Sequence, residues 1–301
     1  MNIGIVGLGY WGQKVYDEYQ LLKETKDVTE VVAIDKDESK INRLSNPDVT
    51  YSSLEKALPR VDALHICTGN RSHYSLGKIG LEASKDVLIE KPLTMDVDDA
   101  FDLVEVASEN GQLLKTGHIF RFANVIRQIK SEYCEGNVGE LNHLQLQWTH
   151  HLSDTSTYEN VLWDLLPHPV DILNFVTDEW PVDVSAESYP SVGSPEAAFV
   201  NLKYSSFIAH IHVSWVDYVR RRSFNLAGSE GSLKAECVSQ NLTIQKNGNS
   251  ETVQLSDNNT IKREATNFID AIKTRENTHN SAIIGARTVR TINRIQSDLN
   301  T

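Results

Sequence analysis

The sequence predicts an α/β domain with a parallel sheet, followed by an α+β domain with an open, largely antiparallel sheet. Up to about residue 120, short apolar runs alternate with longer amphipathic stretches, which is typical of β-α-β units. Beyond Arg121, strand-like runs separated by Gly, Ser, Pro and Asn turns lie beside segregated helical segments. A chain of 301 residues with 40% apolar content suits two domains, predicted at residues 1–120 and 121–301. The C-terminal helices can pack back on the first domain.

The first domain alternates predicted strands and helices. Strands are predicted over residues 2–6, 30–35, 49–51, 63–67, 86–89 and 113–116. Helices are predicted over 12–23, 37–44, 72–83 and 97–109, where Asn110 and Gly111 end the last of them. Six strands joined by helical crossovers indicate one parallel sheet.

The second domain begins with a predicted helix over 122–133, a strand over 143–148 and a helix over 162–175. Successive strands are predicted from 180 to 253, most clearly over 197–203 and 207–215. Helices over 261–273 and 282–295 complete the predicted elements.

Charge and cysteine content exclude several classes of function. The formal charge is −12 and no long basic run exists, so nucleic acid and anionic membranes are not expected partners. No apolar stretch approaches the ~20 residues that a membrane-spanning helix needs, and no signal peptide precedes the first strand, so we expect a cytoplasmic protein. The three cysteines are far apart and lack paired spacing, so neither a disulfide framework nor a metal site is predicted.

A glycine-rich turn follows the first predicted strand directly and opens the first helix. It contains Gly7, Gly9 and Gly12, with Tyr10 and Trp11 between the last two. In this context the three glycines serve a tight turn, close approach of the backbone to a pyrophosphate, and close packing of helix on strand. The amides at the helix N-terminus then face the phosphates. The motif predicts a Rossmann domain that binds a dinucleotide.

An acidic residue at the end of the second predicted strand sets the expected cofactor preference. Asp35 lies 23 residues after Gly12, where a carboxylate accepts hydrogen bonds from the adenosine ribose and repels a 2′-phosphate. NAD is therefore favoured over NADP. The neighbouring Lys36 can soften that repulsion, and the alternative is that Asp35 is only a turn residue.

Further segments resemble the glucose-fructose oxidoreductase, inositol dehydrogenase and rhizopine-catabolism (Gfo/Idh/MocA) family almost from end to end. They are Thr68-Gly69-Asn70 with His73, Glu90-Lys91-Pro92, Gly117-His118 with Arg121-Phe122, Asp164 with His168 and Asp171, and Gly228 to Ser232. Trp163 beside Asp164, and Trp215 after Ser214, look most like members that act on nucleotide-linked or amino sugars. The chain departs from the family pattern at Gly69, Leu166 and Pro169, which puts the choice of substrate in doubt.

The resemblance implies roles for these residues. Thr68, Asn70, His73, Glu90 and Lys91 would complete the cofactor site. Glu90 can also have a structural role.

Catalysis of alcohol oxidation needs a base for the hydroxyl proton, while the cofactor accepts the hydride. Asp164, His168 and Asp171 are spaced i, i+4 and i+7, which places them on one face of a helix. By resemblance, His168 is the base, Asp164 its orienting partner or co-catalyst, and Asp171 a substrate or orienting contact. Lys91 would hydrogen-bond the reacting oxygen and stabilise alkoxide charge. His118, Arg121 and Arg222 are further expected substrate contacts, the arginines toward a carboxylate or phosphate.

The resemblance therefore predicts an NAD-dependent oxidoreductase that acts on a secondary hydroxyl of a sugar, cyclitol or nucleotide sugar. The alternative is a regulator that keeps the fold and binds NAD(P) or a sugar without chemistry. Family members commonly pair through the outer sheet face of the second domain, which here includes Ile208 and His210. We therefore expect a homodimer or homotetramer.

Overall fold

The computed structural model describes residues 1–45, 47–153, 155, 159–256, 259–277 and 279–300. The chain divides into two compact units, Met1–Ile119 with Asn259–Val289, and Phe120–Asn258 with Arg290–Thr301. The first boundary falls beside residue 120. Helix α9 (Thr260–Thr274) belongs to the first unit, whereas α10 (Ala282–Asp298) contributes residues to both.

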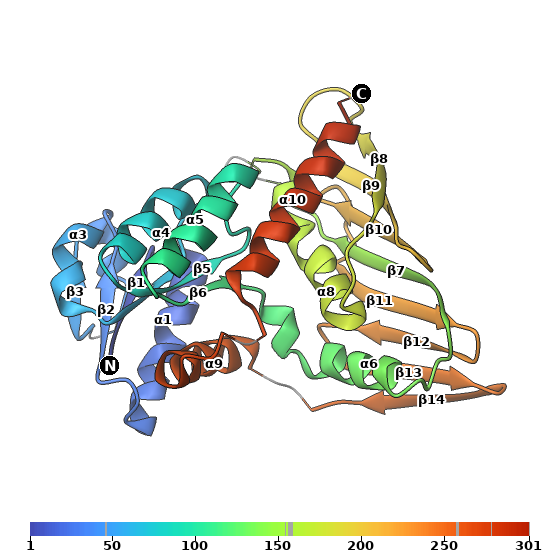
Figure 1. The fold of residues 1–301 in the computed structure, drawn as a ribbon, viewed down its shortest axis with the longest axis horizontal. Coiled ribbons are helices and arrows are strands. Elements are labelled where there is room, and N and C mark those ends of the chain that lie inside the picture. The colour runs from blue at the N-terminus through green and yellow to red at the C-terminus, as the bar shows by residue number, and fades with distance from the viewer. Residues whose placement is uncertain (46, 154, 156–158, 257–258, 278, 301) are drawn as a thin grey trace. The chain divides into compact units, whose positions relative to one another are not determined.

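The first unit contains a six-stranded parallel sheet in the order β3-β2-β1-β4-β5-β6 (Figure 1). The strands are β1 (Asn2–Val6), β2 (Glu30–Ile34), β3 (Val49–Tyr51), β4 (Ala63–Ile66), β5 (Asp86–Glu90) and β6 (Leu114–Gly117). The helices between them are α1 (Tyr10–Leu22), α2 (Glu38–Ile41), α3 (Leu54–Ala57), α4 (His73–Glu82) and α5 (Val97–Glu109). This order is that of a Rossmann fold, as predicted.

Burial on both faces explains the near-continuous apolar runs of these strands. All residues of β4 are buried, including the one polar residue among them, His65. On one face, Tyr19 of α1 and Phe268 of α9 join Ile5 of β1 in a single core cluster. Packing of α9 against α1 thus completes the first unit with residues from far along the chain.

The second unit contains an eight-stranded sheet in the order β14-β13-β12-β11-β7-β10-β9-β8. Its strands are β7 (Leu141–Thr149), β8 (Asp183–Tyr189), β9 (Ala197–Lys203), β10 (Ile208–Ser214), β11 (Arg221–Gly228), β12 (Gly231–Glu236), β13 (Asn241–Lys246) and β14 (Asn249–Gln254). Neighbouring strands are antiparallel except for the parallel pair β7 and β10. The largely antiparallel sheet is confirmed.

Helices cover one face of this sheet. They are α6 (Asn124–Cys134), α7 (Val161–Leu165) and α8 (Pro167–Thr177), and Figure 1 shows α6 and α8 along the same side. In β10, Ala209, Ile211 and Val213 are buried, whereas Ile208 on the alternate side is exposed. Side chains alternate across a strand, so Ile208 points to the second face of the sheet, where none of the described helices buries it.

The single helix predicted over 162–175 is wrong: the structure has two helices, α7 and α8, which meet at Leu166. Pro167 and Pro169 have no backbone N–H and so remove two hydrogen bonds that a continuous helix would make. The Asn160 side chain begins α7 by accepting hydrogen bonds from the amides of Leu162 and Trp163. Asp164 therefore lies on a different helix from His168 and Asp171.

The helix predicted over 37–44 is also shorter than expected, since α2 spans only Glu38–Ile41. Most other predicted bounds differ by one or two residues. Among the described residues, no helix combines the length and apolar character needed to cross a bilayer.

Candidate active-site residues in the two units

The glycine-rich turn between β1 and α1 has the close packing that the motif requires. Gly7 has a φ of +91°, and its amide donates to the Ile34 carbonyl at 2.8 Å. A Cβ on Gly12 would lie 1.8 Å from the Gly7 oxygen, so only glycine fits there. A Cβ on Gly9 would have open space around it, and no side chain caps the N-terminus of α1. The open backbone before a helix N-terminus fits a dinucleotide pyrophosphate.

Asp35 lies beside this turn. Its Oδ2 accepts a hydrogen bond from the Leu8 amide at 2.7 Å, and its Oδ1 accepts one from the Asp37 amide at 2.9 Å. Lys40 of α2 places its Nζ 3.5 Å from the same carboxylate, whereas Lys36 is exposed. Lys40 was not predicted as a site residue; its position on α2 brings its side chain beside Asp35.

Trp11 and Glu90 connect the turn to the end of β5. The Trp11 Nε1 donates to Glu90 Oε1, and His65 Nε2 lies 3.4 Å from the same oxygen. Burial by itself raises the pKa of Glu90, but hydrogen bonds and charge from His65, with a hydrogen bond from Trp11, lower it below its ordinary value. Glu90 is thus a buried, charged anchor for Trp11. Tyr10, by contrast, is 80% exposed at the start of α1.

His73 joins the loops that follow β4 and β5. Its ring is fully buried, with Nδ1 2.8 Å from the Pro92 carbonyl and Nε2 3.1 Å from the Thr68 carbonyl. Burial lowers the pKa of His73. Because both ring nitrogens face backbone carbonyls, His73 fixes Thr68 relative to the segment after Lys91. A direct contact of His73 with the cofactor stays a prediction.

The remaining first-unit residues also lie at the carboxyl ends of the parallel strands. Thr68 and Asn70 follow β4, Lys91 follows β5 and is partly exposed, and His118 follows β6 and is almost fully buried. Strand order reverses between β1 and β4, and open α/β sheets bind ligands at the carboxyl ends beside such a point. The fold therefore brings the predicted cofactor residues to one edge of the sheet.

In the second unit, Arg121 and Asp171 bind each other. The Arg121 Nε donates to Asp171 Oδ1 at 2.7 Å, a terminal guanidinium nitrogen donates to Asn174 Oδ1 at 2.8 Å, and both charged side chains are buried. The guanidinium also lies over the Phe175 ring. This ion pair ties the segment after residue 119 to α8. The predicted substrate contacts of Arg121 and Asp171 stay predictions.

Two aromatic rings lie beside the His168 ring. Phe120 meets the His168 ring edge-on with centroids 5.1 Å apart, and the Trp148 ring centroid lies at 6.4 Å. Phe120 also meets Trp148 edge-on. These contacts restrict the orientation of a side chain that remains partly exposed.

Asp164 and Arg222 are held nearby within the same unit. Asp164 Oδ2 accepts a hydrogen bond from Trp215 Nε1 at 3.0 Å. Arg222 donates to the Thr149 carbonyl at 2.9 Å, lies 3.1 Å from His150 Nδ1, and stacks over Trp148. Burial lowers the pKa of Arg222 to about 10. The predicted substrate contact by Arg222 stays a prediction, since the guanidinium contacts Thr149 and His150 of the protein itself.

His65 on β4 is a second residue near the site that was not predicted. A histidine within an otherwise apolar, buried parallel strand was the available signal. The fold also brings His65, Cys67 and Glu90 within reach of a common metal ion, although no metal site was predicted.

Two family models match the chain. The model described as an oxidoreductase family with an NAD-binding Rossmann fold matches residues 1–118, and the GFO/IDH/MocA C-terminal domain model matches residues 126–234.

Similar proteins include a 1,5-anhydro-D-fructose reductase from Ensifer adhaerens, 29% identical over 62% of this chain and 60% of the relative. A UDP-N-acetylglucosamine 3-dehydrogenase from Acidithiobacillus ferrooxidans is 23% identical over 95% of this chain and 93% of its own length. A crystal structure of that dehydrogenase has the same fold, with a TM-score of 0.88 over 99% of this chain and 97% of the other at 21% identity. The chain therefore belongs to the Gfo/Idh/MocA family and is an NAD(P)-dependent oxidoreductase.

Proposed function

We propose that this oxidoreductase transfers a hydride between a secondary hydroxyl of a sugar, cyclitol or nucleotide sugar and the nicotinamide of NAD. The observation that carries the proposal is the joint presence of a dinucleotide turn, Lys91 at the end of β5, and an oriented His168 on α8. The named activities of the reductase and the nucleotide-sugar dehydrogenase support this substrate class.

Each proposed catalytic group has a stated task. Bound NAD supplies the hydride acceptor. His168 takes the hydroxyl proton, while Phe120 and Trp148 hold its ring. Asp164, fixed by Trp215, orients or assists the base. The Lys91 ammonium hydrogen-bonds the reacting oxygen and stabilises the alkoxide as the proton leaves.

A regulator of the same fold is the second candidate function. It would need the dinucleotide turn but neither Lys91 nor His168. The test is NADH formation by the purified protein with NAD and a panel of cyclitols, sugars and nucleotide sugars. NADH formation with at least one class supports the dehydrogenase. Tight NAD binding with no turnover of any member, in either direction, supports the regulator.

Cofactor preference depends on Asp35 in this proposal. Replacing Asp35 with serine removes the charge that repels a 2′-phosphate and leaves Lys40 beside the site. We expect the dissociation constant for NADP, divided by that for NAD, to fall at least about tenfold. Removing the repulsion between two close negative charges is sufficient for a change of that size. The measurement is cofactor titration by fluorescence or calorimetry. Asp37→Ser is the matched control, because it removes an exposed acid that caps α2. An unchanged ratio in Asp35→Ser would place Asp35 away from the ribose.

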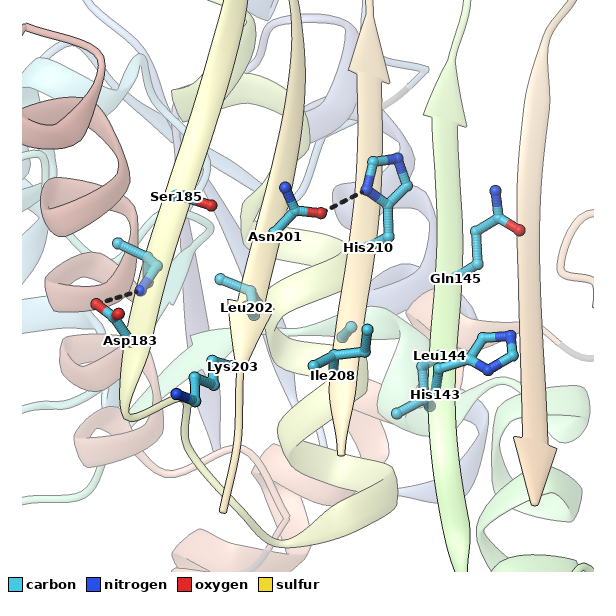
Figure 2. A pocket seen from close by; sticks show the side chains of 12 residues that line it. His143, Leu144, Gln145, Asp183, Ser185, Asn201, Leu202, Lys203, Ile208 and His210 are labelled. Atoms are coloured by element: carbon cyan, nitrogen blue, oxygen red, sulfur yellow. Dashed lines mark hydrogen bonds between the residues drawn. The ribbon is translucent and has the colours of Figure 1, made fainter. Parts of the chain in front are cut away.

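We further propose that two copies associate through the outer face of the second sheet. This face carries Ile208 and Phe199, which are 61% and 48% exposed, among polar side chains that include the charged Lys203 and Asp183. A cavity of about 390 Å³ lies on it. Figure 2 shows His210 facing Asn201 and Ile208 beside His143. His212 stacks on Phe199. A face that mixes polar side chains with exposed apolar groups suits a two-fold interface.

The assembly prediction is a mass of at least twice 33.8 kDa by light scattering at micromolar concentration. The double variant Ile208→Asp with His210→Asp should yield monomers, because it places like charges across the two-fold axis. Lys56→Asp, on the exposed surface of the first unit, is the control and should not change the mass. A parent protein that is monomeric at this concentration contradicts the proposal.

We also propose a cytoplasmic location. Cys67, Cys134 and Cys237 are all free, which suits a reducing compartment.

A further inference from the structure

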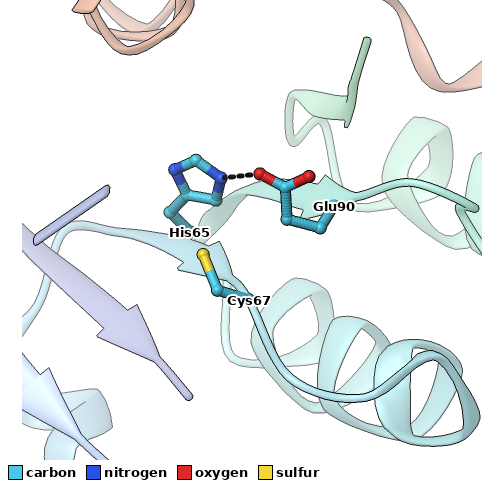
Figure 3. A group of neighbouring side chains, drawn as sticks. All are labelled: His65, Cys67 and Glu90. Atoms are coloured by element: carbon cyan, nitrogen blue, oxygen red, sulfur yellow. Dashed lines mark hydrogen bonds and ion pairs between the residues drawn. The ribbon is translucent and has the colours of Figure 1, made fainter. Parts of the chain in front are cut away.

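Three side chains of metal-binding types meet beneath the glycine-rich turn. His65 lies on β4, Cys67 follows that strand, and Glu90 ends β5 (Figure 3). Residues two apart on a strand share a face, so His65 and Cys67 point to the same side. Ile66 pairs with Ile89, which makes Cys67 and Glu90 lateral neighbours. One potential ligand atom from each side chain lies within 4.8 Å of the other two.

We propose that His65, Cys67 and Glu90 form a binding site for one divalent cation of the zinc class. Zinc bonds of about 2.0–2.3 Å place the ligand atoms of a tetrahedral site ~3.3–3.8 Å apart. His65 Nε2 and Glu90 Oε1 already lie at 3.4 Å. Rotation of the Cys67 side chain therefore has to close the longer separations by roughly 1 Å.

The ligand set fits such a cation in both type and charge. Imidazole, thiolate and carboxylate together are typical of zinc and not of magnesium or calcium, which prefer oxygen alone. One thiolate and one carboxylate offset the charge of a divalent ion, so the occupied site would carry no net charge in a buried position. Without the ion, burial raises the pKa of the Cys67 thiol well above its ordinary value. Binding must therefore displace the thiol proton.

The side of the His65 ring that faces away from Glu90 also has a buried polar atom. His65 Nδ1 and the Tyr19 hydroxyl are buried, and neither has a hydrogen-bond partner among the described residues. The two rings meet edge-on at 5.8 Å. In neutral imidazole one nitrogen carries the proton, so an Nδ1 that accepts no hydrogen bond can carry it and leave Nε2 to bind the cation.

Two residues outside the cluster hold the Glu90 side chain in place. Trp11 Nε1 donates to it, and a Cβ on Gly117 would lie 2.8 Å from its Oε2. Outer contacts of this kind orient metal ligands and limit their movement.

The test uses Co²⁺ as a spectroscopic substitute for Zn²⁺. The full-length protein is stripped with chelator, kept reduced, and titrated with Co²⁺ in the absence of NAD. We expect one ion per chain, a thiolate-to-cobalt charge-transfer band, intense tetrahedral d–d bands, and release of about one proton per ion. Stoichiometric Zn²⁺ should abolish the spectrum by displacing Co²⁺. Absence of a charge-transfer band in the unmodified protein overturns the proposal.

Variants assign the ligands. Cys67→Ser should remove the charge-transfer band, and His65→Asn and Glu90→Gln should each weaken Co²⁺ binding at least about tenfold, with circular dichroism confirming the fold. Cys134→Ser and Cys237→Ser are matched controls, since these thiols lie in the second unit, and both should retain the parent spectrum. A band that survives Cys67→Ser and is lost in either control places the metal elsewhere and rejects this site.

Discussion

Replacing Lys91 or His168 with alanine is expected to lower kcat by about 10² or more, because each change removes a group that acts in the transition state. His168→Ala removes the base, and Lys91→Ala removes the cation that stabilises the alkoxide. Lys91 is only one of several predicted cofactor contacts, and the glycine-rich turn and Asp35 stay intact in both variants, so NAD should still bind within a few fold. The measurements are steady-state kinetics with the substrate found in the panel, and NAD titration of each variant.

Two further variants separate loss of chemistry from loss of structure. Lys56→Ala removes an exposed lysine from α3 and should retain the parent kcat. His168→Asn keeps a polar side chain between Phe120 and Trp148 but cannot take the proton at neutral pH, so it should be as slow as His168→Ala. Parent-like activity in a folded Lys91→Ala or His168→Ala protein would remove that residue from the mechanism.

Alanine substitutions at Gly12 and Gly9 are expected to fail in different ways. A Cβ on Gly12 would press on the Gly7 carbonyl at 1.8 Å, so the turn must deform. We expect Gly12→Ala to lose about 1–3 kcal/mol or more of folding stability, the range of overpacked sites. Its NAD affinity should fall about 10²-fold or more, since the amides of α1 would lose their alignment.

Gly9→Ala tests the same turn without a clash. Because no protein atom lies within 4 Å of the added methyl group, the free energy of unfolding should stay near that of the parent. The methyl group would instead occupy space for the pyrophosphate, so NAD affinity should fall at least about tenfold. Chemical denaturation and NAD titration measure both quantities. Parent-like NAD affinity in Gly9→Ala would show that the pyrophosphate does not pass over this backbone.

The elements that sequence predicted best are those whose signals are local. The glycine-rich turn, the buried strands β1 and β4 and the alternation in β10 depend on near neighbours along the chain. Helix α7 and helix α8 were merged because hydrophobic spacing continues through Leu166, although the two prolines that break the hydrogen bonding were visible.

Contacts between residues far apart in the chain could not be predicted from such local signals. Packing of α9 on α1 depends on complementary apolar faces that the chain separates by more than 200 residues. The contact of Lys40 with Asp35 depends on how α2 turns back after β2. Likewise, no local pattern indicated that Arg121 and Asp171 neutralise each other in a buried pair.

By itself, the sequence determined the two fold classes, the dinucleotide turn with its acid, and the residue types available for proton transfer. These properties follow from periodicity, from the conformations open to glycine, and from side-chain chemistry. Only the tertiary structure decided which side chains are neighbours: Glu90 with Trp11, His65 and Cys67, and Asp164 with Trp215. The physical reason is that neighbouring strands and packed helices bring together residues whose separation along the chain carries no record of their distance in space.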